Sequence, residues 1–152
     1  MKRVLFILGQ LSDSDIEWLI ENGDRKFIRQ GEYLVQQDET IENIYIILDG
    51  HFRIFNEDNT AYDIARIGSG EVIGEMSFLD DRPPSVSVIA TEDAMVYEIS
   101  LELVKRYMEV NTRFAARFYY ALAMFLSDRL RKTTSRLGYG EPVTDDSADE
   151  IN

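Results

Sequence analysis

The chain has 152 residues, 45% of them hydrophobic, which is enough for one domain with an apolar core and too few for two ordinary domains. It carries 28 acidic and 16 basic residues, and a formal charge of −12 disfavours binding to nucleic acid phosphates. It has no cysteine and one histidine, His51, which excludes disulfides, thiolate metal sites and histidine metal clusters. We expect no metal site, and the absence of cysteine is consistent with the cytoplasmic location that we expect. The sequence has no nucleophile elbow, Walker loop or dinucleotide-binding glycine pattern, so we expect no catalytic residue.

The N-terminus resembles an export signal only superficially. Met1-Lys2-Arg3 is followed by five apolar residues, short of the roughly 7–15 that a signal peptide needs. The longest uncharged apolar stretch elsewhere, 118–127, is half of the roughly 20 residues that span a bilayer. We expect neither an export signal nor a membrane span.

The first hundred residues are typical of a β-rich fold. Ser12 or Asp13 can cap a short helix that ends at Asn22-Gly23. The Asp49-Gly50 pair predicts a hairpin between the strands on either side of it. Many short strands separated by turn residues favour a sandwich or a jelly roll. The predicted strands are 43–48, 51–55, 62–67, 86–90 and 94–99.

The pattern becomes helical after the last strand. Ser100 caps a helix over 101–109, and Asn111 caps a longer one that runs to about Arg136. The longer helix is apolar around most of its circumference, so it must be covered on more than one side. One side can pack on the β-domain, and a second copy of the helix is the simplest cover for the other. We predict a homodimer through residues 112–136; the alternative is that the β-domain covers the helix entirely.

Charge is distributed unevenly along the chain. Residues 1–100 have a net charge of −12, residues 101–137 of +5 and residues 138–152 of −5. The last segment has too few apolar residues to order itself, which predicts a disordered acidic tail. The alternative is that the tail contacts the basic helix before it.

One segment resembles a known family. Residues 70–79, GEVIGEMSFL, continue into DDRPPSVSV at 80–88, and together they resemble the phosphate-binding cassette of cyclic nucleotide-binding domains. Residues 31–38 and 44–50 are similar to the family's early strand and central hairpin, so the resemblance covers roughly residues 10–136.

The resemblance implies a fold that is mainly β: a double-stranded β-helix jelly roll with flanking helices, followed by a long C-terminal helix. In effector domains of the catabolite-activator type this last helix commonly forms a dimer coiled coil. We expect a cyclic nucleotide-binding-like domain over 1–137, with the β-roll at about 24–99 and the C-terminal helices at about 101–136. The acidic tail then covers 138–152.

The resemblance also implies a ligand site made of Gly74, Glu75, Met76, Ser85 and an arginine. A glycine lets the backbone approach a ligand closely, and the N–H groups at the start of the next helix point at a phosphate. A carboxylate at Glu75 suits a ribose hydroxyl, and Ser85 places its hydroxyl beside the expected phosphate. The arginine that holds the phosphate in the family falls at Pro84 here.

Proline cannot replace a guanidinium, because it has neither charge nor N–H. Loss of one member of a charged contact costs roughly 2–5 kcal/mol, or about 1.5 to 3.5 powers of ten in affinity. Arg82, two residues earlier, has the right chemistry and is our candidate replacement. Gln37 is a second departure, at a position where the family usually has glycine.

Two functions are consistent with these observations. The first is a stand-alone regulatory or sensor domain that binds cyclic AMP or cyclic GMP weakly and signals through its C-terminal helices. The second is a dimeric interaction module of the same fold that has lost the nucleotide and binds an unknown protein partner. A DNA-binding regulator would need a helix-turn-helix domain, and only the acidic tail follows the long helix. We expect no cofactor beyond the candidate nucleotide.

Overall fold

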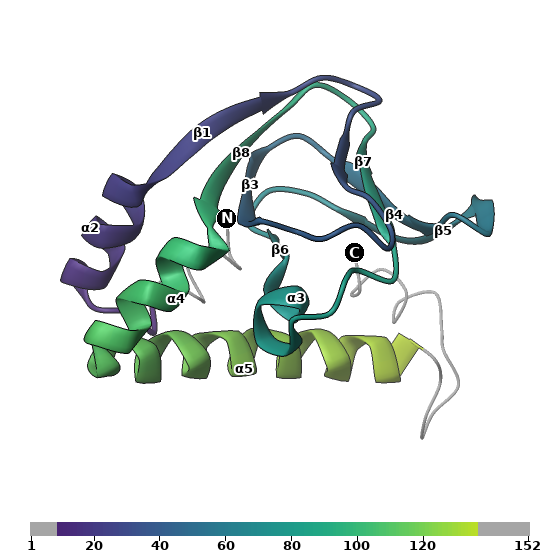
Figure 1. Ribbon diagram of the computed structural model, residues 1–152. Helices are drawn as coiled ribbons and strands as arrows, with labels where there is room; N and C mark the ends of the chain where they lie inside the picture. Colours follow the sequence, from purple (N-terminus) through teal and green to yellow (C-terminus); the bar gives the residue numbers. More distant parts are fainter. Residues whose placement is uncertain (1–8, 137–152) are drawn as a thin grey trace.

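Two four-stranded antiparallel sheets form the β-roll of the protein (Figure 1). The computed structural model describes residues 9–136. One sheet has the order β1-β8-β3-β6 and the other the order β2-β7-β4-β5. The strands are β1 (Gly23–Ile28), β2 (Tyr33–Val35), β3 (Asn43–Asp49), β4 (Phe52–Asn56), β5 (Asn59–Ile67), β6 (Val72–Ile73), β7 (Ser87–Ala90) and β8 (Ala94–Ser100).

Strand β3 shows how the alternation of side chains builds two cores. Tyr45 and Ile47 point between the sheets, where they join a cluster that includes Phe52. Ile44, one residue away, points to the opposite face and packs in a second cluster with the helices, which includes Leu122. The first sheet is therefore covered on both faces, and its outer face is the surface on which the C-terminal helices rest.

The predicted hairpin around Asp49-Gly50 is wrong. Strand β3 pairs with β6 and β8, whereas β4 pairs with β5 and β7 in the other sheet. Gly50 adopts a φ of +96°, and a Cβ at this position would lie 2.5 Å from the Cβ of Ala94. The turn therefore carries the chain from one sheet to the other, past a neighbouring backbone that leaves no room for a side chain.

Four helices pack around the roll: α2 (Asp13–Asn22), α3 (Glu75–Asp80), α4 (Leu101–Val110) and α5 (Thr112–Arg136). Ser12 caps α2 in a capping box with Asp15. The hydroxyl of Ser100 accepts the N–H of Leu103 at the start of α4, and the side chain of Asn111 accepts the N–H of Phe114 in α5. These caps are the ones expected from the sequence.

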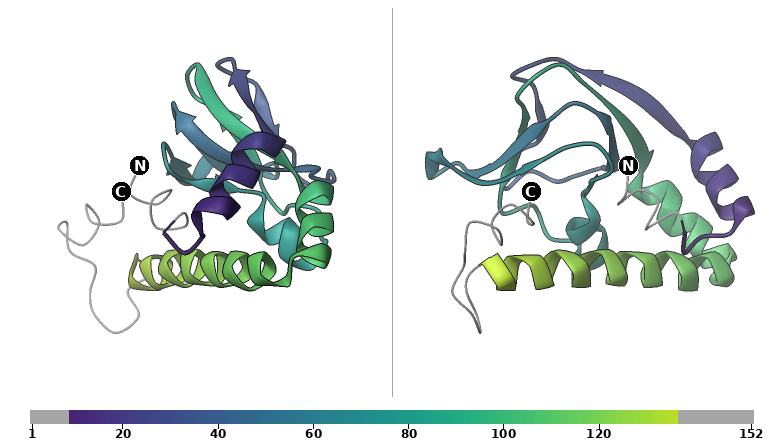
Figure 2. Two further views of the ribbon diagram at one scale, coloured as in Figure 1. Left: turned by 90° about the vertical axis from the view of Figure 1, so that its left-hand side faces the viewer. Right: turned by 180° about the vertical axis from the view of Figure 1, so that it is seen from behind.

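Helix α5 runs across the base of the β-roll, and α3 lies between the roll and this helix (Figures 1 and 2). Its residues Phe118, Leu122 and Phe125 are at most 5% exposed and pack in the same cluster as Phe78 of α3. The fold class predicted from the sequence, a mainly β jelly roll with flanking helices and a long C-terminal helix, is confirmed. The predicted tail at 138–152 lies outside the described residues. Within 9–136 no helix is both long and apolar enough to cross a bilayer.

Candidate functional site

The turn from β6 into α3 is built around Gly74. This residue has a φ of +97°, and a Cβ on it would lie 2.8 Å from the carbonyl oxygen of Asn43 in β3. Only glycine fits both constraints. The tight turn places Glu75 as the first residue of α3, and its carboxylate contacts Arg129 of α5.

The carboxylate of Glu75 is held by an arginine from α5. The Nη1 atom of Arg129 donates to Oε1 of Glu75 at 2.9 Å, and its Nη2 atom donates to Oε2 of Glu71 at 3.1 Å. The same Nη2 lies 3.4 Å from the carbonyl oxygen of Val72. The guanidinium also stacks over the ring of Phe125, with its central carbon 4.6 Å from the ring centroid. One cation of the C-terminal helix thus bridges two carboxylates that flank β6.

This cluster is almost closed to solvent. The side chain of Glu75 is 4% exposed, that of Glu71 11% and that of Arg129 31%. Burial raises the pKa of Glu75 above its usual value, although the charge of Arg129 opposes the rise. Glu71 adds to the rise because it is a second carboxylate close by. Burial therefore disfavours the charged form of the Glu75 carboxyl, and the contact with Arg129 favours it.

The sequence analysis missed Arg129 and Glu71 as site residues. Arg129 follows Phe118, Leu122 and Phe125 at helical spacing, so it continues the buried stripe of α5. A charged residue that continues such a stripe must meet a buried partner of opposite charge, and this was the available signal.

The other predicted site residues do not gather around Glu75. The side chain of Met76 is 61% exposed on α3. Arg82 is exposed and lines a surface groove of about 600 Å³ together with Lys105 and Arg106 of α4. Ser85 is exposed, and its carbonyl oxygen lies 3.5 Å from Nδ2 of Asn56. Within residues 9–136 no hydrogen bond or ion pair joins the Arg82 side chain to Glu75 or to Ser85.

Pro84 lies where the end of the cassette meets the segment after β2. Its carbonyl oxygen accepts the N–H of Asp38 at 2.9 Å. The buried hydroxyl of Ser87 accepts the N–H of Gln37 at 3.0 Å. Gln37 is the second position that differs from the family pattern, and its segment is therefore hydrogen-bonded to the cassette at two points. The half-buried proline ring supplies no charge to this end of the site.

Comparison with known proteins gives the family. A family model described as "Cyclic nucleotide-binding domain" matches residues 25–111, more than half of the chain. The chain belongs to the cyclic nucleotide-binding domain family. The cyclic AMP receptor protein of Thermus thermophilus is 28% identical over 133 residues, which is 84% of this chain and 58% of that protein. The Pycsar effector protein PaPycTIR of Pseudomonas aeruginosa is 31% identical over 83 residues, which is 54% of this chain and 26% of that protein.

Solved structures of the family share the fold. The crystal structure of Thermus thermophilus catabolite activator protein matches with a TM-score of 0.71 and 25% identity, over 87% of this chain and 61% of that chain. A cyclic nucleotide-binding domain from Methylobacillus flagellatus matches with a TM-score of 0.78 and 19% identity, over 95% of this chain and 87% of that chain. The chain spans little more than half of the receptor protein it resembles.

Proposed function

We propose that this cyclic nucleotide-binding domain is a regulatory domain that binds cyclic AMP or cyclic GMP weakly at its cassette and signals through α5. The observation that carries the proposal is the contact between Arg129 and Glu75. This contact joins Glu75, whose carboxylate suits a ribose hydroxyl, directly to the C-terminal helix α5. The role is one of binding and signalling in the cytoplasm, not of catalysis.

Two features make the expected binding weak. Pro84 stands where the family pattern has the arginine that holds the cyclic phosphate, so that charged contact is missing. In addition, Glu75 is 3% exposed and already accepts from Arg129, so a ribose hydroxyl must compete for an occupied acceptor. A hydrogen bond to a charged group contributes about 1.5–3 kcal/mol, which is comparable with what the ligand gains from the same oxygen.

The same competition couples the ligand to the helix. A ligand that takes Glu75 removes one partner of Arg129 and changes the balance of contacts that hold this part of α5 against the cassette. By linkage, any ligand with different affinities for the paired and unpaired states shifts the equilibrium between them. The output of the domain is therefore a change in how firmly α5 packs.

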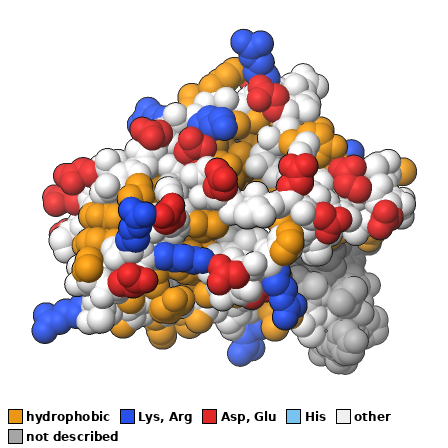
Figure 3. All heavy atoms as spheres, viewed as in Figure 1, with side chains coloured by type: hydrophobic (Ala, Val, Ile, Leu, Met, Phe, Trp, Pro, Cys, Tyr) orange, Lys and Arg blue, Asp and Glu red, His pale blue; other side chains and the backbone are white. Residues whose placement is uncertain are grey.

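We further propose that α5 joins two copies of the chain. Its inward face is buried against the roll, but Tyr119, Tyr120, Met124 and Leu130 are 36–66% exposed. The lower edge of the molecule, along α5, also shows hydrophobic side chains beside Lys and Arg at the surface (Figure 3). A second copy would cover these residues, and a change in the packing of α5 would then reach the partner subunit.

One observation favours an interaction module without a nucleotide as the second candidate. Glu75 and Glu71 are already paired by Arg129 of the same chain, so both carboxylates have a cationic partner without a ligand. In this alternative the dimer and its surface carry the function, and an unidentified protein is the partner.

Calorimetric titration with cyclic AMP and cyclic GMP decides between the two. The proposal predicts saturable binding to the wild-type protein and its loss in Glu75→Gln, a variant that keeps the size of the side chain. As a control, Glu102→Gln removes an equally negative but exposed side chain of α4 and leaves binding unchanged. Absence of binding by both nucleotides supports the interaction module and contradicts the proposal.

A further inference from the structure

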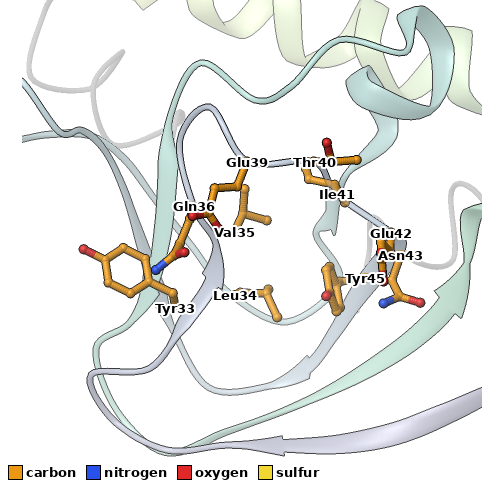
Figure 4. Close-up of a pocket in the computed structure, with 10 residues that line it drawn as sticks. All are labelled: Tyr33, Leu34, Val35, Gln36, Glu39, Thr40, Ile41, Glu42, Asn43 and Tyr45. Carbon is orange, nitrogen blue, oxygen red and sulfur yellow. The ribbon is translucent and has the colours of Figure 1, made fainter.

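A second cavity lies outside the cassette cluster. It has a volume of about 340 Å³ and is formed by β2, the segment 36–42 and the first residues of β3 (Figure 4). Its size is at the lower end of the roughly 300–1,000 Å³ that is usual for small-molecule sites. Gly74, Glu75 and Arg129 do not line it. A ligand bound here would therefore leave the Arg129–Glu75 contact untouched.

Apolar groups lie at the floor of this cavity, although most of the surface of the cavity is polar. Leu34, Val35 and the ring of Tyr45 line it, and the three residues are 9%, 5% and 8% exposed. Figure 4 shows Leu34 and Tyr45 at its centre, between β2 and the segment 36–42. These side chains belong to the core between the two sheets, so the floor is rigid. Such a floor suits a short hydrocarbon stem.

The hydroxyl of Tyr45 is the polar group of this floor. It makes no hydrogen bond within residues 9–136, although the residue is 8% exposed. Every fully buried side-chain nitrogen or oxygen in the described part of the chain has a hydrogen-bond partner, so this unpartnered hydroxyl keeps some accessible surface, and Tyr45 is among the residues that line the cavity. A tyrosine that is largely buried normally finds a partner for its hydroxyl. A ligand in the cavity would supply one.

The rim of the cavity is negatively charged. Glu39 and Glu42 line it, and in the part of the chain that the structure describes neither carboxylate has an ion pair or a hydrogen bond. No Lys, Arg or His is among the residues that line the cavity. Two unpaired carboxylates beside a low-dielectric floor favour a cation over a neutral or anionic ligand.

Backbone contacts hold the wall of the cavity in place. The N–H groups of Gln37 and Asp38 donate to the cassette strand and to Pro84, and the carbonyl oxygen of Glu42 accepts the N–H of Leu101 at 3.0 Å. The segment 36–42 is thus fixed near both ends. The cavity is formed without a ligand, which reduces the ordering that binding requires.

We propose that this cavity binds a small organic cation: a guanidinium or ammonium head on a short apolar stem. The head lies between Glu39 and Glu42 and donates a hydrogen bond to the hydroxyl of Tyr45, while the stem packs on Leu34 and Val35. The cation has two possible sources, a free amine or guanidine and the side chain of a lysine or arginine in a protein partner. The site is separate from the cassette and does not depend on the function proposed for it.

Titration with butylguanidinium tests the site, followed by NMR of the methyl groups of Leu34 and Val35. The proposal predicts saturable shifts of these methyls, whereas butylurea, which has the same shape and no charge, produces none. The proposal is overturned if the two probes bind equally or if butylguanidinium produces no saturable shift. Comparison with a short capped peptide containing one arginine separates the sources: tighter binding of the peptide indicates a protein partner, and tighter binding of butylguanidinium indicates a free ligand.

Three variants and one control locate the binding. Tyr45→Phe keeps the ring that packs in the core and weakens binding three- to tenfold; Glu39→Gln and Glu42→Gln each weaken it at least twofold. Glu21→Gln removes the same charge from the exposed surface of α2 and leaves the affinity unchanged. Equal effects of Glu21→Gln and Glu42→Gln would show that the cation is attracted only by the net charge, and would contradict the site. Unchanged binding in Glu75→Gln keeps this outcome distinct from that of the cassette.

Discussion

The Nη1 atom of Arg129, near the end of α5, lies 2.9 Å from Oε1 of Glu75, the first residue of α3. The two residues are 54 positions apart in the chain, and their contact is largely shielded from solvent. Helix α5 is therefore held by a direct contact to the turn at the start of α3.

Removal of Arg129 should destabilise the fold. Arg129→Gln leaves the buried carboxylate of Glu75 without its cation, and the expected loss is about 3 kcal/mol in the free energy of unfolding. The double variant Arg129→Gln/Glu75→Gln should recover part of this loss, because that carboxylate is gone. Urea unfolding of the four proteins in the cycle measures the coupling. Additive effects of the two substitutions would show that the pair contributes no coupling energy.

Stability should fall as the pH rises through the range in which Glu75 ionises. Burial raises the pKa of Glu75 above its usual 4.5 in the folded chain, so the folded state holds this proton more tightly than the unfolded state. The contribution of Glu75 to the free energy of unfolding is fully present below the usual pKa and is lost as the pH rises past the raised pKa of the folded state. Urea unfolding between pH 4 and 8 should show this slope in the wild type, and Glu75→Gln should reduce it. An identical pH dependence in the variant contradicts the assignment.

The opposite pH dependence is expected from Asp15 in α2. The hydrogen bonds from Arg117, at 2.5 and 2.9 Å, lower the pKa of this buried carboxyl. Its contribution to stability is present above the usual pKa and is lost as the pH falls below about 4. Asp15→Asn should remove this acid sensitivity and cost about 2 kcal/mol at neutral pH. Asp13→Asn, an exposed neighbour on the same helix, should change neither property.

Restoring a cation at the end of the cassette should strengthen nucleotide binding. Pro84→Arg introduces a guanidinium where the family pattern has one, and we expect the affinity for cyclic AMP to rise at least tenfold, since a charged contact contributes roughly 1.5–3 kcal/mol. Pro83→Arg adds the same charge one residue earlier, at an exposed position that faces the α4 groove. Calorimetry should find little change for this control. Equal gains in the two variants would mean that only net charge matters.

The dimer should depend on the exposed face of α5. Tyr120 is 56% exposed on this helix and Tyr62 is 62% exposed on β5. Tyr120→Glu places a charge in the proposed interface and should shift sedimentation at micromolar concentration from dimer to monomer. Tyr62→Glu is the matched control and should remain dimeric. A wild-type protein that sediments as a monomer contradicts the dimer itself.

The sequence predicted where helices and strands begin and end better than it predicted which strands pair with one another. Ser12, Ser100 and Asn111 cap helices because their side chains act on backbone groups three residues away, and such local chemistry can be read from the chain. Asp49-Gly50 was misread because a glycine with positive φ serves a hairpin and a crossover between sheets equally well; the difference lies in Ala94, more than 40 residues away.

In the candidate site, too, some positions follow from adjacent residues and others depend on how distant elements pack. The turn at Gly74 and the place of Glu75 at the start of α3 follow from adjacent residues, whereas their role in binding a ligand stays a prediction. Arg129 could not be assigned to Glu75, because that contact depends on the angle at which α5 crosses the base of the roll. Arg82 lines the groove beside α4 in this structure, and its role as the phosphate ligand stays a prediction.

The most direct test of the account compares the affinity of cyclic AMP for two proteins by calorimetry: Pro84→Arg, whose affinity is expected to exceed that of the wild type, and Pro84→Arg/Arg129→Gln. Arg129 and the ribose hydroxyl compete for the same carboxylate in this account, so removal of Arg129 should tighten binding at least threefold. Circular dichroism of both variants establishes that they are folded. Equal or weaker binding by the double variant would show that Arg129 does not compete with the ligand, and would contradict the proposed coupling between the cassette and α5.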